Sequence, residues 1–94
     1  MATSTAHVLT PNATSYLRQL CRHWSHRFPV EFDDQQGRIE LPTSVCTLHA
    51  TAEALDVAVD LQPAADQERV ESVVAEHLQR FGFRETLVFD WKRS

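Results

Sequence analysis

The sequence predicts an α+β fold, a two-layer sandwich in which two helices cover one face of a mostly antiparallel sheet of five to six strands. Several short segments alternate apolar and polar residues, which is typical of strands with one buried and one solvent-facing side. Two longer segments repeat apolar residues at helical spacing. The 94 residues, 43% of them hydrophobic and only two of them glycine, have the composition of one globular domain over residues 1–94. The expected order of elements is β-α-β-β-β-β-α-β.

The N-terminal part of the chain predicts a strand followed by a helix. Residues 3–10 alternate as a half-buried strand does. Thr10 and Pro11 are typical of a helix start, with threonine as the N-cap and proline at the first helical position. The helix is expected to reach about Phe28, because Pro29 disfavours helical backbone in the residue before it.

The middle of the chain predicts four strands. They are expected over residues 30–33, 38–41, 45–50 and 55–61. The first two form a hairpin through residues 34–37, where Gly37 is free to adopt a positive φ. All four alternate apolar and polar residues, so one face of the sheet is expected to be buried and the other to meet solvent.

The C-terminal part predicts a second helix and a last strand. The helix is expected to begin between Pro63 and Asp66 and to end at Gly82, where a glycine just past the last periodic residue suits a Schellman-type stop. Residues 86–91 then alternate as the strand that completes the sheet. The inward side chains of this strand are expected to be Leu87, Phe89 and Trp91.

The first helix carries a basic surface. Its apolar side chains cluster on one side at 100° per residue, whereas basic residues lie opposite that cluster or flank it. Residues 11–30 contain no acidic residue. We call the following set the basic face: Arg18, Arg22, His23, His26 and Arg27. It is either an ordinary solvated helix surface or a docking site for an anionic small molecule or an acidic protein surface.

Histidine and cysteine side chains are expected in the core. His77 falls within the apolar stripe of the second helix, where a histidine needs a hydrogen-bond partner. Cys21 and Cys46 also face inward by the periodicity of their segments, and both are expected to be free thiols. If the three side chains meet, their ligand types suit zinc. A Cys–His nucleophile is a third possibility, and it requires an exposed thiol of low pKa.

Acidic side chains fall on the outward positions of the strands. They are Glu31, Asp33, Glu40, Asp56, Asp60 and Asp90. Paired catalytic carboxylates usually need a cleft that separates their pKa values, which an open sheet face does not offer. We therefore interpret these residues as a solvated surface.

Charge and hydropathy narrow the classes of partner. The net charge of −4 disfavours a nucleic-acid-binding protein. No apolar run approaches the length of a membrane span, and the first residues lack the pattern of a signal peptide. We expect a cytoplasmic protein without a membrane or nucleic-acid partner. The sequence identifies no cofactor and no oligomeric state.

Several blocks of the sequence together resemble one family. They are "YLRQLCRHWSHRFPVEFD", "GRIELP", "CTLHA" and "VVAEHLQRFGFRE" with a closing tryptophan. They are similar to a family of small bacterial proteins known as domain of unknown function 2218. The resemblance implies a domain that stands alone or is appended to siderophore-interacting proteins, and it transfers no catalytic residue.

Together, residues and resemblance favour a non-enzymatic bacterial binding or interaction module, accessory to siderophore and iron handling. A metal-binding protein that uses Cys21, Cys46 and His77 is the alternative.

Overall fold

The computed structural model describes residues 2–94, which form six strands and two helices. The elements are β1 (Ala2–Leu9), α1 (Ala13–Ser25), β2 (Val30–Phe32), β3 (Gln36–Leu41), β4 (Ser44–Ala50), β5 (Ala54–Leu61), α2 (Gln67–Phe81) and β6 (Lys92–Arg93). This confirms the predicted α+β class and the predicted order of elements. Neither helix in this part of the chain is long and apolar enough to cross a membrane.

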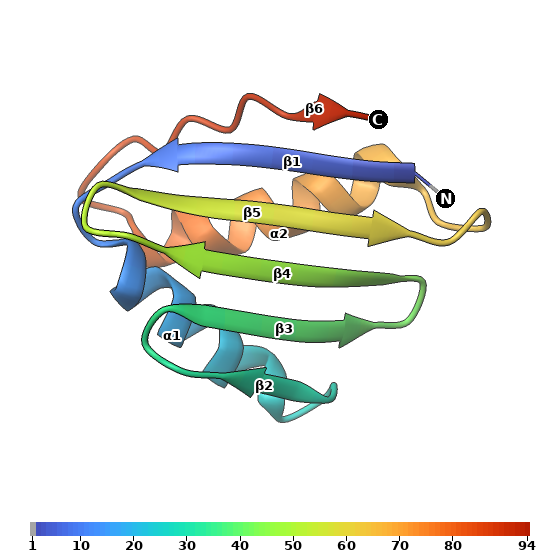
Figure 1. Ribbon diagram of the computed structural model, residues 1–94, viewed down its shortest axis with the longest axis horizontal. Helices are drawn as coiled ribbons and strands as arrows, with labels where there is room; N and C mark the ends of the chain where they lie inside the picture. The colour runs from blue at the N-terminus through green and yellow to red at the C-terminus, as the bar shows by residue number, and fades with distance from the viewer. Residues whose placement is uncertain (1) are drawn as a thin grey trace.

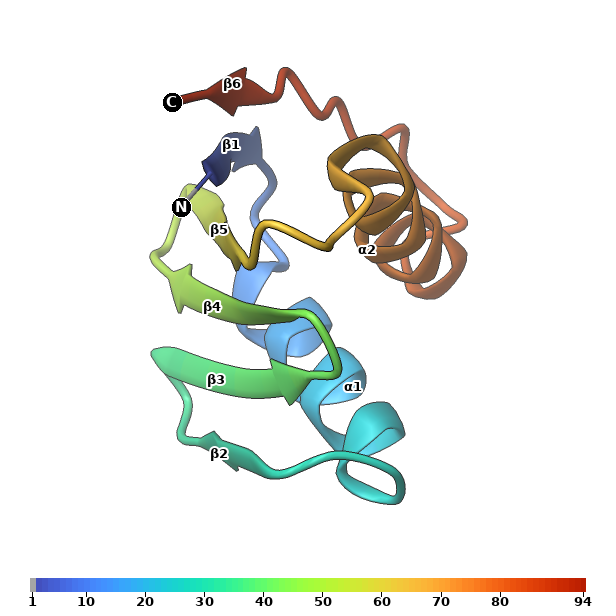
Figure 2. The ribbon, with the colours of Figure 1, turned by 90° about the vertical axis from the view of Figure 1, so that its right-hand side faces the viewer.

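The strands form one sheet in the order β2-β3-β4-β5-β1-β6, and every neighbouring pair is antiparallel. The strands from β2 to β5 follow one another along the chain, whereas β1 inserts between β5 and β6 (Figure 1). Figure 2 shows both helices on the same side of the sheet, as predicted. The opposite face is left open, and we call it the outer face.

The core lies between the sheet and the helices. In β5 the alternation gives Leu55, Val57, Val59 and Leu61 as buried side chains that are at most 1% exposed. Helix α1 covers them with its predicted apolar side, in which Trp24 is 5% exposed. Phe28, where the sequence predicted the end of this helix, is only half-buried.

Helix α1 is shorter than predicted at both ends. Thr10 is not the N-cap, which is Asn12; instead, the Thr10 hydroxyl accepts a hydrogen bond from the Asn12 backbone N–H at 3.1 Å. At the other end the helix stops at Ser25, and the N–H groups of Arg27 and Phe28 both donate to the carbonyl of Trp24. A short turn, and not a continuation of the helix, therefore leads into Pro29.

Gly37 does not serve the turn that the sequence predicted. The turn precedes it, where the Asp33 carboxylate accepts the backbone N–H groups of Gln35 and Gln36 at 2.8 Å. Gly37 lies within β3, faces inward and has no positive φ. A Cβ atom at this position would lie 2.7 Å from the Sγ atom of Cys21. The glycine is therefore needed for close packing of α1 on the sheet.

The C-terminal segment differs from the prediction in two respects. Helix α2 ends at Gly82 as expected, but φ there is −98°, so no Schellman motif forms. A Cβ at Gly82 would lie 2.8 Å from the Tyr16 hydroxyl oxygen, which again indicates close packing. Residues 86–91 form no strand. Within the C-terminal segment only β6 pairs with β1.

The inward direction predicted for this segment is confirmed in part. Leu87 is buried, whereas Phe89 and Trp91 are half-buried and stack on each other with ring centroids 5.9 Å apart.

Candidate functional site

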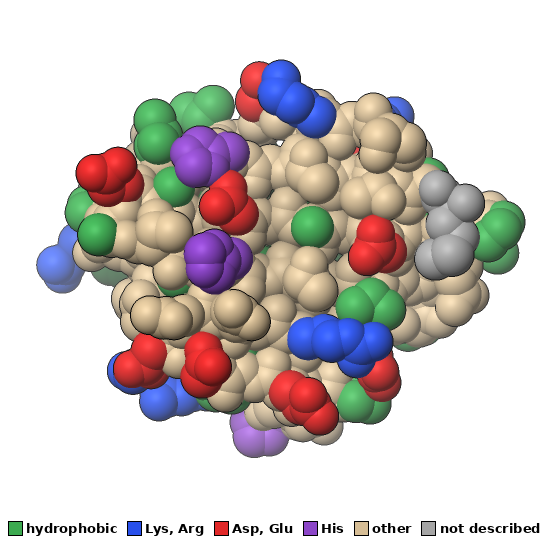
Figure 3. Space-filling model, in the orientation of Figure 1, with side chains coloured by type: hydrophobic (Ala, Val, Ile, Leu, Met, Phe, Trp, Pro, Cys, Tyr) green, Lys and Arg blue, Asp and Glu red, His purple; other side chains and the backbone are tan. Residues whose placement is uncertain are grey.

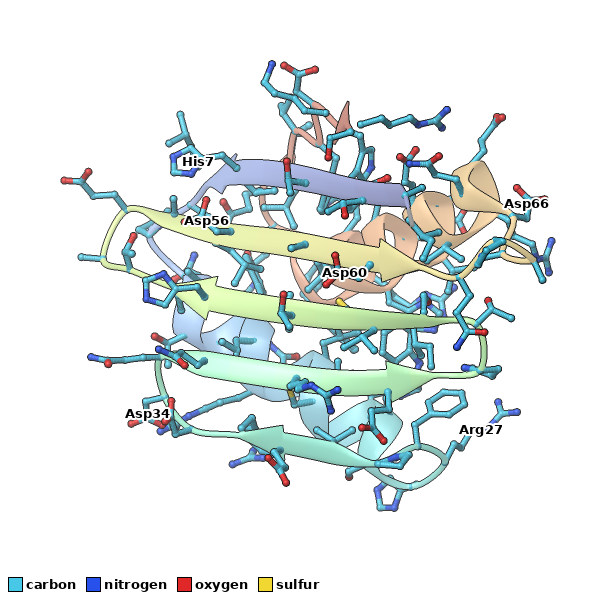
Figure 4. The ribbon with its side chains drawn as sticks, turned by 45° about the vertical axis from the view of Figure 1, so that its right-hand side comes forward. His7, Arg27, Asp34, Asp56, Asp60 and Asp66 are labelled. Carbon is cyan, nitrogen blue, oxygen red and sulfur yellow. The ribbon has the colours of Figure 1, made fainter. Side chains whose placement is uncertain are left out.

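The basic face lies on α1 and on the turn that follows it. Arg22, His23, His26 and Arg27 are exposed, and none of them forms an ion pair within residues 2–94. Arg18 differs, because its guanidinium pairs with the carboxylate of Asp34 in the β2–β3 turn. Arg27, at the other end of the basic face, lies far from Asp34 (Figure 4). Four of the five predicted residues thus keep their charge or hydrogen-bonding capacity free for a partner.

The structure brings together two histidines that the sequence placed in different roles. His77 on α2 is half-buried and its Nδ1 atom donates a hydrogen bond to the Val73 carbonyl at 2.7 Å, which confirms the expected hydrogen bond. Its ring centroid lies 5.3 Å from that of His23 and 5.1 Å from that of Trp24. His77 therefore packs beside the basic face, at the contact between the two helices.

The two cysteines, Cys21 on α1 and Cys46 on β4, are fully buried in the core between the helix and the sheet. Burial raises the pKa of Cys21 to about 11. Burial, together with the nearby Cys21, raises the pKa of Cys46 to about 12. Both thiols are thus protonated at neutral pH, which removes the low-pKa thiol that a Cys–His nucleophile requires. Among the described residues, no three His, Cys, Asp or Glu side chains form a group that could hold a metal ion.

The outer face of the sheet carries an arrangement that the sequence did not reveal. The strand register places Gln36, His49, Asp56 and His7 in one row across β3, β4, β5 and β1. Within this row, Nδ1 of His7 pairs with the carboxylate of Asp56. Figure 3 shows two histidines with a carboxylate between them on this face, and Figure 4 labels His7 and Asp56 side by side.

Next to this row the outer face is hollowed. The hollow has a volume of about 1130 Å³ and reaches from Glu31 on β2 to Lys92 on β6. Thr5, Thr47 and Ala58 lie opposite one another at its centre. These small side chains leave a shallow trough that runs across the strands.

The charges on the outer face are mostly negative. We call the following set the acidic sheet face: Glu31, Asp33, Glu40, Asp56, Asp60 and Asp90. Two cations share this surface, and each is already paired: Arg38 with Glu40 at 2.6 Å and Lys92 with Asp90 at 3.7 Å. The other four carboxylates have no Arg or Lys partner within 4 Å in the described part of the chain. The alternation of the strands predicted the outward direction of these groups, but the strand order was needed to show that four of them, Glu31, Asp33, Asp56 and Asp90, line one hollow.

Two further carboxylates anchor the C-terminal segment. Glu71 on α2 is only 6% exposed and accepts hydrogen bonds from Ser4 Oγ at 2.6 Å and from Arg93 Nε at 3.0 Å and Nη2 at 2.9 Å. The Arg93 hydrogen bonds, aided by Ser4, hold the pKa of Glu71 below its usual range. These contacts join α2, β1 and β6, so we assign Glu71 a structural role.

Glu85 plays the corresponding part at the opposite end of α2. Its carboxylate accepts hydrogen bonds from the hydroxyls of Tyr16 and Thr10 and from the Asn12 amide. The Tyr16 hydrogen bond is the main cause of the lowered pKa of Glu85. The loop after Gly82 is thereby tied to the beginning of α1.

Comparison with known proteins identifies a family and a similar solved structure. The model of a family described as "uncharacterized protein conserved in bacteria (DUF2218)" matches residues 5–92. The NMR structure of PA4090 from Pseudomonas aeruginosa is 32% identical with a TM-score of 0.73, and the match covers 100% of this chain and 96% of that chain. No curated protein matches the sequence. The link to siderophore-interacting proteins that the resemblance implied stays a prediction.

Proposed function

The chain belongs to the bacterial family DUF2218, and within that family we propose that this domain is a binding module that docks an acidic protein surface on its basic face. The observation that carries the proposal is the set of four exposed basic side chains, Arg22, His23, His26 and Arg27, without an ion-pair partner among residues 2–94. The arginines among them suit carboxylates, because a guanidinium can donate two parallel hydrogen bonds to one carboxylate.

A binding role is favoured over nucleophilic catalysis by the state of the cysteines. The thiols of Cys21 and Cys46 are buried and have raised pKa values, so they are poor nucleophiles. The basic face, in contrast, is accessible without any rearrangement of the fold. The siderophore connection implied by the family resemblance makes a ferric-siderophore reductase the first natural partner to test.

The proposal is tested by titrating the isotope-labelled protein with an oligoglutamate peptide and following backbone amide shifts by NMR. We expect saturable shifts at Arg22, His23, His26 and Arg27 that weaken as salt rises, because exposed charges are screened beyond about 10 Å at 0.1 M salt. The variant Arg22→Glu/Arg27→Glu is expected to lose at least about tenfold in affinity, equivalent to about 1.4 kcal/mol.

The matched control is Arg69→Glu/Arg84→Glu. Both of these arginines are exposed, lie outside the basic face and, when reversed, change the net charge by the same amount. This control is expected to bind the peptide within about twofold of the wild type. Equal losses in both variants, or peptide shifts scattered over the surface, would reject the basic face as the docking site. A parallel titration with citrate distinguishes a small anion from a protein surface, since saturation by citrate alone would contradict the proposed partner.

A further inference from the structure

The open face of the sheet and the exposed side of helix α1 carry charges of opposite sign. The acidic sheet face covers the open side of the sheet, whereas the basic face lies on α1, on the side that the helices occupy (Figure 2). Four carboxylates on one side have no Arg or Lys partner, and four basic side chains on the other side have no ion pair, within residues 2–94.

We propose that the acidic sheet face of one copy of this chain docks on the basic face of the next copy, so that the protein associates head to tail. This inference rests on the proposed function, because it names the acidic protein surface that the basic face binds. It commits the open face of the sheet to one occupant, which is α1 of another copy.

The dimensions of the two surfaces agree. Six strands at about 4.8 Å spacing extend about 24 Å across the sheet, and the trough follows that direction from Glu31 to Lys92. Helix α1 has 13 residues and is therefore about 20 Å long. The small side chains of Thr5, Thr47 and Ala58 in the middle of the trough would allow its side chains to approach the sheet.

The trough also supplies hydrogen-bonding groups. The row of His49, Asp56 and His7 borders the trough and offers ring nitrogens and a carboxylate to incoming side chains.

The placement of the two faces determines the type of assembly. Because they lie on opposite sides of the molecule, two copies cannot satisfy both faces in one twofold pair. The contact is heterologous, so each copy that joins leaves one free face of each sign. Contacts between exposed charges are weak and sensitive to salt. The mean mass is therefore expected to rise with protein concentration at low salt and to return to the monomer value at high salt.

The experiment combines sedimentation velocity with a complementation of two variants. Arg22→Glu/Arg27→Glu removes the basic face and keeps the acidic one, whereas Glu31→Gln/Asp56→Asn weakens the acidic face and keeps the basic one. Each variant alone is expected to associate at least about tenfold more weakly than the wild type. An equimolar mixture is expected to form a pair and no larger species, because only one matching contact remains. Arg69→Glu/Arg84→Glu is expected to associate like the wild type.

The outcomes separate the inference from the proposed function. A wild type that stays monomeric at low salt and millimolar-range concentration, or a mixture that forms no pair, overturns head-to-tail association. Association that survives both variants overturns it as well. If the oligoglutamate titration still gives the expected shifts in those cases, the proposed function stands and the partner is another protein. Thermal unfolding of each variant, and the pairing of the mixture itself, verify that the variants are folded.

Discussion

The core beneath α1 and the C-terminal segment after α2 are held in place by different forces. The core consists of apolar side chains from α1 and the middle strands that are almost completely removed from water. The C-terminal segment has little regular structure between Gly82 and β6. Besides the packing of Leu87, Phe89 and Trp91 on the core, it is fixed by polar contacts of Glu71, Glu85 and Gln79. Apolar burial acts wherever side chains pack, whereas the polar contacts depend on particular pairs and on their ionisation.

The largest expected effect is in the core. Trp24→Ala is expected to reduce the free energy of unfolding by about 3–5 kcal/mol, because it leaves a cavity where a buried indole packed. The measurement is denaturant unfolding followed by circular dichroism. Phe83→Ala is the control, since this aromatic ring is 76% exposed and its loss is expected to change stability by less than about 0.5 kcal/mol. A cost below about 1 kcal/mol for Trp24→Ala would show that α1 does not bury this face.

The next effect concerns the anchor of β6. Glu71→Gln keeps the shape of the side chain but removes the charge that Arg93 and Ser4 recognise. We expect a loss of about 1–2 kcal/mol, less than for a fully buried pair because the Arg93 side chain is half-exposed to solvent. Glu68→Gln in the first turn of the same helix is the control. Amide hydrogen exchange measures the effect in each region. If Glu71→Gln accelerated exchange equally in the α1 core and in β6, the distinction between the two regions would be wrong.

Acid is expected to release the C-terminal segment. The pKa values of Glu71 and Glu85 are lowered by their hydrogen bonds in the folded state. Each carboxylate therefore contributes stability above its unfolded pKa of about 4.3, and this contribution is lost as the pH falls through the lowered folded value. NMR shifts of the amides of Leu87 and Ser94 should change in this acidic range before those of the α1 core. Simultaneous changes in both regions would contradict the separation.

The smallest expected effect is at the contact of Tyr16 with Glu85. Tyr16→Phe removes the hydroxyl that donates to the carboxylate but keeps the ring that packs on Gly82. We expect a cost of about 0.5–1.5 kcal/mol. A double-mutant cycle with Glu85→Gln measures the coupling between the two side chains. Strict additivity would mean that this hydrogen bond contributes nothing to holding the loop.

The contrast between the core beneath α1 and the C-terminal segment also explains what could be predicted from the sequence. Apolar periodicity predicted α1, β5 and α2, because the spacing of side chains along one element decides which of them are buried. It could not predict the role of Gly37, which depends on the approach of Cys21 from another element. It also predicted a strand at 86–91. There Leu87 is buried as expected, but its backbone N–H donates to Oε1 of Gln79 instead of pairing with β1.

The basic face and the acidic sheet face also differ in how far the sequence could predict them. The basic face was predicted because all its residues lie on one helix and the turn after it, so a helical wheel was sufficient. The acidic sheet face was interpreted as ordinary solvated surface. The neighbours of Asp56 across the sheet, His7 and His49, follow only from the order and register of the strands.

The position of β1 in the sheet has a consequence for the way the chain folds. The strands from β2 to β5 pair with their neighbours in sequence, so these hairpins require only short loops to close. β1 must instead pair with β5, which comes much later in the chain. His7 on β1 and its partner Asp56 on β5 are 49 residues apart. Closing a loop of that length costs more chain entropy and makes the step slower. During synthesis β1 leaves the ribosome before β5 does. It is therefore expected to wait unpaired while strands β2 to β5 assemble, and its insertion beside β5 completes the sheet late.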